Sequence, residues 1–332
     1  MILTPAIIAL MMGLVIAVVM TVYSSTIGIR ILRDWDISSG SESQLELERK
    51  TYLISTILAY VMGFELFSLF LFVYTVDSIH GLFVGAMCAA GSLNVNGYGY
   101  SALLVKMLVF CLCGLWLILN HTDNQAADYP LIRRKYRFLL TITGLILLES
   151  FLVFHYFAGM QPQVITSCCG ALFSGKAGGL AGDMAAMPPL VAKTLFYLSV
   201  VLTVRSGVHT YATGRGARVF GWLSLWLLLF SLVSIVSFIS VHFYELPTHH
   251  CPFCLLQKEY GYVGYPLYLS LFGAGIAGTG AAMLDRFRSV ASLAEVVPRV
   301  QKHLCLTAIV GFVLFAAIAS YPLLFSDFIL EG

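Results

Sequence analysis

The sequence predicts an all-α integral membrane protein: a polytopic helical bundle of about eight transmembrane helices with both termini extracytoplasmic. Of its 332 residues, 59% are hydrophobic and only 11% are charged. That charged fraction is under half the value of about 25% that is usual for a soluble domain, so a soluble fold is excluded. Basic and acidic residues nearly balance, at 19 and 17, and they form no basic stripe that could bind nucleic acid.

Eight apolar segments are long enough to cross the hydrocarbon core, which takes about 20 helical residues. The first lacks a preceding basic segment and a following small-residue cleavage site, so we expect a retained helix rather than a signal peptide. We expect residues 1–332 to form one membrane domain. The predicted spans are 5–29, 52–76, 101–120, 138–158, 188–208, 219–243, 255–283 and 304–325.

Basic residues predict the orientation, because Lys and Arg are retained on the cytoplasmic side. The predicted cytoplasmic connections are 34–50, 121–137, 209–218 and 284–303. The loops 77–100, 159–187 and 244–254 then lie outside, as in a multi-pass protein of a bacterial inner membrane. On the predicted cytoplasmic side lie 15 of the 19 basic residues: Arg30, Arg33, Arg49, Lys50, Arg133, Arg134, Lys135, Arg137, Arg205, Arg215, Arg218, Arg286, Arg288, Arg299 and Lys302.

Two hairpins, 52–120 and 138–208, resemble each other weakly. Glu65 and Glu149 each begin a similar Phe- and Leu-rich stretch, and each hairpin has a cysteine loop followed by a lysine-bearing helix. A duplicated hairpin explains this pattern, and chance recurrence of Phe and Leu in membrane helices explains it as well. A third hairpin, 219–283, carries a Cys-x-x-Cys pair.

The cysteines divide between the outer loops and the spans. Cys111, Cys113 and Cys305 fall inside spans, where cysteine usually serves as a small apolar packing residue. In an oxidising compartment, outer cysteines form structural disulfides, take part in thiol exchange or bind metal. Five cysteines are predicted in or beside the outer loops: Cys88, Cys168, Cys169, Cys251 and Cys254.

The Cys251-Pro-Phe-Cys254 segment is the sharpest motif, and it is predicted at the outer end of the seventh span. The helix dipole at such a position lowers the pKa of a thiol, and His249 and His250 can add positive charge or accept a proton. We therefore expect Cys251 to be the more reactive thiol of a redox pair. A static disulfide and half of a metal site are the alternatives.

Residues 251–258, Cys-Pro-Phe-Cys-Leu-Leu-Gln-Lys, resemble the Cys-x-x-Cys-aliphatic-x-Gln-basic signature of the bacterial DsbB family, and more loosely the vitamin K epoxide reductase group. Those membrane proteins form or transfer disulfides and pass electrons to a quinone. The resemblance implies that Cys251 and Cys254 are the quinone-proximal pair, that Gln257 belongs to the quinone site and that Lys258 is the basic residue near the quinone. It also implies a second cysteine pair in a periplasmic loop.

Cys168 and Cys169 are adjacent, so a disulfide between them closes a strained ring that is readily reduced. Alternatively, one bridges to Cys88 while the other exchanges with Cys251 or Cys254. Neighbouring thiols also bind soft ions such as Cu(I) or Hg(II). In this alternative the metal ligands are Cys88, Cys168, Cys169, His249, His250, Cys251 and Cys254.

Ionisable residues inside predicted spans are costly and usually face the protein interior. The sequence suggests two pairs, Glu65 with Lys106 and Glu149 with Lys193. They are either structural ion pairs or parts of a proton path.

Other polar and small residues have simpler interpretations. His155 and His242 lie near the outer ends of two spans; as haem b ligands they would have to face each other, and we expect hydrogen-bonded packing residues instead. Tyr260 can line a quinone pocket, although it also fits an interfacial aromatic belt with Tyr262, Tyr265 and Tyr268. Gly273 and Gly275 are expected to allow close helix packing.

Together these features predict a membrane thiol-disulfide oxidoreductase that passes electrons between an extracytoplasmic thiol protein and a membrane quinone. One alternative is a soft-metal transporter or chaperone of the copper or mercury type. Another is an anchor subunit of a respiratory or cytochrome-maturation complex, whose partners are the other subunits.

Overall fold

The computed structural model describes all residues except 1–3, 162–163, 167–172, 174–179, 327 and 329–332. The described part is helical and contains no strand beyond one isolated bridge between Val84 and Ile165, so the predicted all-α class is confirmed. The long helices are α1 (Pro5–Asp34), α2 (Glu42–Ser78), α4 (Tyr98–Asp123), α5 (Ile132–Ala158), α8 (Pro189–Thr213), α9 (Ala217–Ser234), α11 (Gly264–Asp285) and α12 (Val296–Phe325).

Shorter elements connect or extend these helices. The π-helical turn η2 (Ile235–Ile239) and α10 (Ser240–Tyr244) continue α9 without a break. The other short elements are η1 (His80–Leu82), α3 (Ala89–Leu93), α7 (Leu180–Ala185), η3 (Cys254–Leu256), η4 (Lys258–Tyr260) and η5 (Ala291–Leu293).

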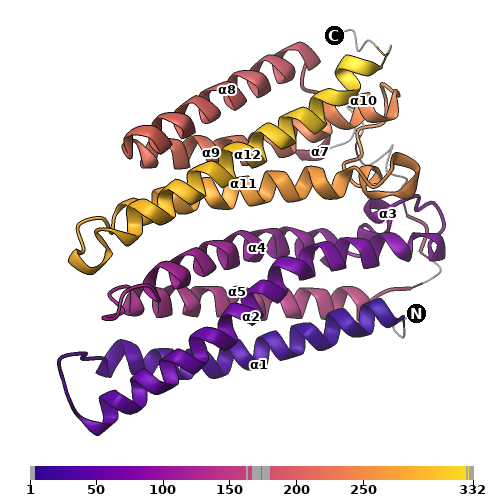
Figure 1. The fold of residues 1–332 in the computed structure, drawn as a ribbon. Helices are drawn as coiled ribbons and strands as arrows, with labels where there is room; N and C mark the ends of the chain where they lie inside the picture. The colour runs from indigo at the N-terminus through magenta and orange to yellow at the C-terminus, as the bar shows by residue number, and fades with distance from the viewer. Residues whose placement is uncertain (1–3, 162–163, 167–172, 174–179, 327, 329–332) are drawn as a thin grey trace. The chain divides into compact units, whose positions relative to one another are not determined.

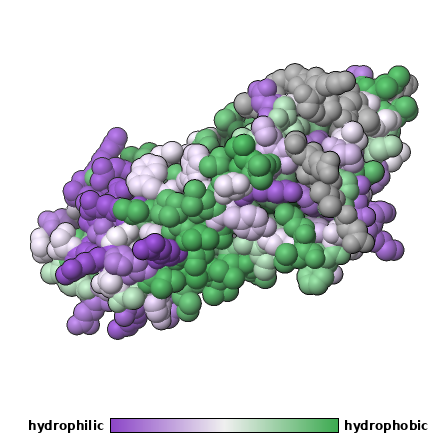
Figure 2. Space-filling view, turned by 90° about the horizontal axis from the view of Figure 1, so that it is seen from above, coloured by the Kyte–Doolittle hydropathy of each residue, from purple (hydrophilic) through white to green (hydrophobic). Residues whose placement is uncertain are grey.

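The chain is a multi-pass membrane protein. Among the described residues, eight helical segments are long and apolar enough to cross a membrane, in agreement with the predicted number of spans. Large hydrophobic side chains lie on the surface of these helices, including Met12, Phe67, Leu104, Trp222 and Val310. Figure 2 shows hydrophobic residues over much of the visible face. Such extensive apolar exposure is typical of helices that face lipid.

The chain divides into two compact units. Unit 1 comprises Met1–Thr75, Asn96–Met160 and Phe287–Val297, and it contains α1, α2, α4 and α5 (Figure 1). In it α5 packs against both α1 and α4, around a core that includes Trp116 and Tyr136. Gly28 of α1 leaves room for the Tyr136 ring, whose Cδ1 atom lies 2.8 Å from the position of an added Cβ.

Unit 2 comprises Val76–Val95, Gln161–Arg286 and Pro298–Gly332, and its long helices are α8, α9, α11 and α12. Helix α9 packs against α8 and α11. The approach of α9 and α11 depends on Gly278, because an added Cβ there would lie 2.1 Å from Ser224 Oγ. Gly275 also allows close packing, as predicted, because an added Cβ there would lie 2.9 Å from Leu228 Cδ2. Gly273 does not: no described atom lies within 4 Å of its Cβ position, so that prediction is wrong.

Helix α11 begins at Gly264, nine residues after the predicted start of the span at 255. The chain between Cys254 and Gly264 instead forms two single 3-10 turns, η3 and η4. Gly261 and Tyr262 both adopt left-handed backbone conformations, which end η4 and separate it from α11. The prediction that the Cys-x-x-Cys pair opens a long helix is therefore wrong.

Candidate functional site

Cys88 is held at the start of the short helix α3. Its backbone is extended and precedes Ala89, whose N–H donates a hydrogen bond of 2.9 Å to Asp77 Oδ1. Asp77 thus satisfies one of the N–H groups that a helix start leaves unpaired. Upstream, Gly85 has a φ of +89°, and an added Cβ would lie 2.4 Å from the Thr166 carbonyl oxygen. The glycine therefore lets the loop before Cys88 lie against residue 166.

The Cys251–Cys254 segment lies between α10 and α11. Glu245, with a left-handed φ of 54°, follows the last residue of α10. The backbone of the segment is then fixed by two buried or half-buried phenols: Tyr244 Oη donates to the Cys251 carbonyl at 2.5 Å, and Tyr268 Oη donates to the Pro252 carbonyl at 2.8 Å. These bonds hold both cysteines at a defined place in unit 2.

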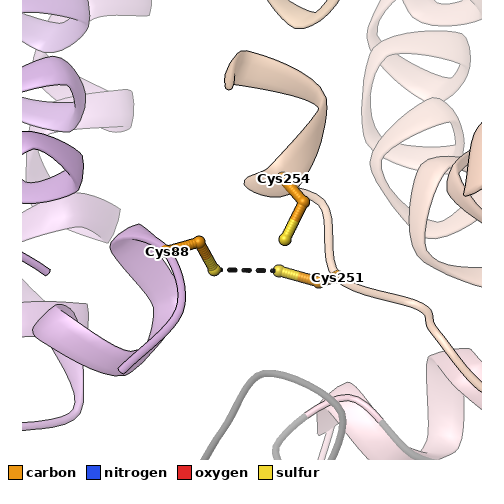
Figure 3. A group of neighbouring side chains, drawn as sticks. All are labelled: Cys88, Cys251 and Cys254. Carbon is orange, nitrogen blue, oxygen red and sulfur yellow. Dashed lines mark hydrogen bonds between the residues drawn. The ribbon is translucent and has the colours of Figure 1, made fainter. Parts of the chain in front are cut away.

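Three cysteine sulfurs converge in this unit, and we call Cys88, Cys251 and Cys254 the three-cysteine cluster (Figure 3). Cys88 Sγ lies 3.5 Å from Cys251 Sγ, and all three sulfurs lie within 4.8 Å of one another. Cys88 and Cys251 are fully buried, and Cys254 is 5% exposed. A disulfide needs an S–S distance of about 2.05 Å, so Cys88 and Cys251 are in contact but not bonded.

The two histidines have different positions. His249 Nε2 lies 3.4 Å from Cys254 Sγ, whereas His250 Nδ1 lies 2.9 Å from the Val236 carbonyl oxygen. Val236 belongs to the π-helical turn η2, and such turns change the carbonyl pairing of a helix. The histidine ring next to the cluster therefore lies beside Cys254, whereas Cys251 is the thiol that we expect to be more reactive from its place in the sequence.

Gln257 connects the two cysteine-bearing segments. Its side-chain nitrogen donates hydrogen bonds to Asp77 Oδ1 at 3.2 Å and to the Met87 carbonyl at 3.0 Å. The Asp77 carboxylate oxygen that caps α3 therefore also binds the segment after Cys254. This gives Gln257 a positioning role in addition to the quinone role that the resemblance implies.

Lys258 and Tyr260 lie in η4. Lys258 is exposed, and its 3-10 turn is separate from the turn that contains Cys254, so the two residues do not share one helix. The ring of Tyr260 packs against that of Tyr244 with centroids 4.6 Å apart. Tyr260 is thereby linked through Tyr244 to the backbone of Cys251.

Cys168 and Cys169 lie outside the described residues. Described residues on either side of them contact the cluster region. The Thr166 N–H donates to the Val84 carbonyl at 2.9 Å. The Phe173 ring lies 6.3 Å from the ring of Phe253, the residue that precedes Cys254 in the sequence. Of the remaining cysteines, Cys111 and Cys113 are in α4 and Cys305 is in α12, inside spans as predicted.

In unit 1, the intramembrane charges pair differently from the prediction. Lys106 Nζ lies 2.6 Å from Glu149 Oε1, so Glu149 pairs with Lys106 instead of Lys193. Lys106 also donates to Ser68 Oγ at 2.6 Å, and Ser68 donates to Glu65 Oε2 at 3.1 Å. Glu65 is therefore connected to Lys106 through Ser68. Lys193 is half-buried in α8 of unit 2.

The two candidate haem histidines bind main-chain oxygens within their own helices. His155 Nδ1 lies 2.9 Å from the Phe151 carbonyl oxygen, and His242 Nδ1 lies 2.7 Å from the Phe238 carbonyl oxygen. Each ring also packs against neighbouring aromatic rings, Phe151 for His155 and Phe238 for His242. These contacts match the interpretation as packing residues.

A groove of about 540 Å³ lies between α9 and α11, where α9 begins and α11 ends; its lining includes Arg218, Trp222 and Arg286. The cysteines lie beyond the other end of α11, and a helix of 22 residues is roughly 33 Å long. A quinone in this groove would be too distant to exchange electrons with the three-cysteine cluster.

Several residues that build these sites carry no recognisable pattern in the sequence. Asp77 does not stand out in the sequence, because a single acidic residue at the end of a predicted span is typical of the membrane–water interface. Tyr244 and Ser68 were equally unremarkable, since their roles depend on contacts with distant segments.

Comparisons with protein-family models, with curated proteins and with solved structures found no match.

Proposed function

We propose that this protein is a membrane thiol-disulfide oxidoreductase, with Cys251 and Cys254 as its redox pair and Cys88 as a third exchanging thiol. The contact of 3.5 Å between Cys88 Sγ and Cys251 Sγ carries the proposal. Thiol-disulfide exchange begins when a thiolate meets one sulfur of a disulfide, and Cys88 lies where it can attack Cys251. The resemblance of residues 251–258 to the DsbB signature supports the same chemistry.

The internal exchange step balances without another reactant. The Cys88 thiolate attacks Cys251 of the Cys251–Cys254 disulfide, forming a Cys88–Cys251 disulfide and releasing Cys254 as a thiolate. His249, whose Nε2 atom lies 3.4 Å from Cys254 Sγ, is placed to stabilise that thiolate as an imidazolium. Cys254 is then the sulfur that faces the electron acceptor.

The overall reaction joins two half-reactions. A dithiol partner reduces the Cys251–Cys254 disulfide, giving two thiols in this protein and a disulfide in the partner. A quinone then takes two electrons and two protons from the pair, becoming a quinol as the disulfide forms again. The direction follows the reduction potentials of partner and quinone. Lys258 and Tyr260, in the turn after Cys254, are the proposed quinone contacts.

The proposed topology places the cluster at the extracytoplasmic surface of a bacterial inner membrane, with both termini on that side. Gly40, in the connection between α1 and α2, is then cytoplasmic, and Gly81, in η1, is outside; both have open space around their Cβ positions. In intact cells, an impermeant thiol reagent should label Gly81→Cys but not Gly40→Cys. The opposite labelling would invert the topology.

The redox proposal is tested with purified protein in lipid, a dithiol donor and a soluble quinone, followed by quinone absorbance. Cys251→Ser and Cys254→Ser should abolish quinone reduction, because neither variant can form the redox disulfide. Cys111→Ser, in the middle of α4 in unit 1, is the matched control and should retain the native rate. No reduction by the native protein with several donors would rule the proposal out.

A soft-metal site is the second candidate function, and the mutual proximity of the three sulfurs favours it. With zinc–sulfur distances of about 2.3 Å, two thiolate sulfurs bound to one tetrahedral zinc ion lie roughly 3.8 Å apart. The three sulfurs of this cluster, all within 4.8 Å of one another, can adopt that spacing. However, three buried thiolates around a monovalent or divalent ion leave a net negative charge, which is costly in an apolar site. Thiol exchange involves one thiolate at a time. Tight stoichiometric binding of Cu(I) without quinone reduction would establish the metal function instead.

A further inference from the structure

A cluster of ionisable groups lies inside unit 1, within the predicted membrane spans and outside the proposed redox site. It consists of Glu65 and Ser68 on α2, Lys106 on α4 and Glu149 on α5, and we call it the carboxyl cluster. None of its four side chains is more than 2% exposed. Three helices therefore bring two acids and one cation together out of contact with solvent.

The charges of this cluster do not balance when every group is ionised. Lys106 Nζ neutralises Glu149 through the contact of 2.6 Å, and this leaves the negative charge of Glu65 uncompensated. The titratable groups around Glu65 are Lys106 and Cys113 from α4 and Glu149 from α5. A buried carboxylate without a counter-ion is strongly disfavoured, and such a group is normally neutralised by a proton.

The hydrogen bonds show the same deficit of one proton. Among the described residues, Glu65 Oε1 and Glu149 Oε2 are buried and have no hydrogen-bond donor. The other oxygen of each acid is satisfied, Glu65 Oε2 by Ser68 and Glu149 Oε1 by Lys106. Ionised carboxylates can only accept hydrogen bonds, so two of them cannot pair with each other.

We propose that Glu65 and Glu149 bind one exchangeable proton between them. The proton resides on Glu65 Oε1 and is donated to Glu149 Oε2, so it supplies the missing donor and cancels the excess charge at once. Ser68 Oγ and Lys106 Nζ lie 2.6 Å apart, and they bind the Glu65 and Glu149 carboxyls respectively, so the two acids are held by neighbouring donors. The carboxyl cluster is then a proton-binding site inside the membrane, independent of the three-cysteine cluster.

The experiment is infrared spectroscopy of the native protein in lipid nanodiscs, with ¹³C-labelled glutamate to identify carboxyl bands. At neutral pH, we expect one C=O band of a protonated glutamic acid, and we expect it to shift in D₂O as deuterium replaces the proton. Glu65→Gln should remove the band. Glu46→Gln, an exposed position on the same helix α2, should leave it unchanged.

Lys106→Met provides a second, opposite test that does not depend on the folding of Glu65→Gln. Without its cation, the carboxyl cluster needs two protons to be neutral. The intensity of the C=O band of protonated glutamic acid should therefore about double. Absence of the band from the native protein, or an unchanged band in Lys106→Met, would overturn the proposal. A native band that does not shift in D₂O would show that the proton does not exchange.

Discussion

The side chain of Gln257 joins the segment after Cys254 to Asp77, with Gln257 Nε2 3.2 Å from Asp77 Oδ1. The same oxygen accepts the Ala89 N–H next to Cys88. One carboxylate oxygen thus holds both cysteine-bearing segments, although Asp77 and Gln257 are 180 residues apart. Asp77 is therefore bonded to both segments that bring Cys88 and Cys251 together.

We predict that Asp77→Ala slows oxidative cross-linking of Cys88 to Cys251, whereas Asp77→Asn leaves it near the native rate. Asn keeps the Oδ1 acceptor, but Ala leaves two donors unpaired, at a cost of roughly 1–3 kcal/mol for each buried one. The measurement is the rate of Cys88–Cys251 disulfide formation with a mild oxidant, read by peptide mass spectrometry in a Cys254→Ser background. Equal rates in the two variants would show that Asp77 does not position the cluster.

A second prediction concerns the buried ion pair between Lys135 Nζ and Asp123 Oδ2, at 2.9 Å in unit 1. Asp123 Oδ1 also accepts the Leu131 N–H at 2.7 Å, just before α5 begins. Lys135→Met leaves Asp123 buried without its cation, and we expect a loss of about 3–5 kcal/mol in the free energy of unfolding.

The double variant Lys135→Met with Asp123→Asn should be less destabilised than Lys135→Met alone. It buries no charge, and the Asn side chain can still accept the Leu131 N–H. Thermal unfolding in detergent measures both effects. Additive losses in the double variant would mean that the two residues do not form an energetically coupled pair.

A third prediction compares two glycines of α11. An added Cβ at Gly278 would lie 2.5 Å from Ser224 Cβ in α9, whereas Gly273 has no described atom within 4 Å. Gly278→Val should therefore force α9 and α11 apart and lower the unfolding temperature, with a loss of roughly 1–3 kcal/mol for the overpacked contact. Gly273→Val is the matched control and should change stability little. A large loss for Gly273→Val would indicate a contact on that face of the helix.

The eight spans could be predicted because membrane insertion depends on local hydropathy. The exception is the start of the seventh span. Leu255 and Leu256 extend the apolar run toward Cys254, so the predicted span began at 255. The chain instead buries both leucines in η3 and begins α11 at Gly264, which packs against the Leu255 backbone. Hydropathy alone does not distinguish apolar residues buried in protein from those buried in lipid.

The partners of site residues could not be predicted in the same way. The sequence grouped Cys88 with Cys251 and Cys254, but it did not show which sulfurs meet across 163 residues. The suggested pairing of Glu149 with Lys193 followed the apparent hairpin repeat, whereas α5 packs against α4 and so meets Lys106. Such contacts depend on which helices become neighbours, and hydropathy carries no information on that choice. The duplicated hairpin itself stays a prediction.

The last prediction concerns the order of exchange within the three-cysteine cluster. Replacing Cys254 by Ser removes the sulfur that would compete for Cys251, and it leaves Cys88 Sγ in contact with Cys251 Sγ at 3.5 Å. Only a small movement brings this pair to the length of a disulfide bond, about 2.05 Å. Cys254→Ser should therefore accumulate a Cys88–Cys251 disulfide, tested in a background with Cys168→Ser and Cys169→Ser to exclude other outer cysteines. Cys88→Ser in that background should instead retain the Cys251–Cys254 disulfide. Mass spectrometry of non-reduced peptides distinguishes these products. If Cys254→Ser stays fully reduced under oxidant while the native protein forms Cys251–Cys254, then Cys88 does not exchange with Cys251, and its proposed role as a third thiol is wrong.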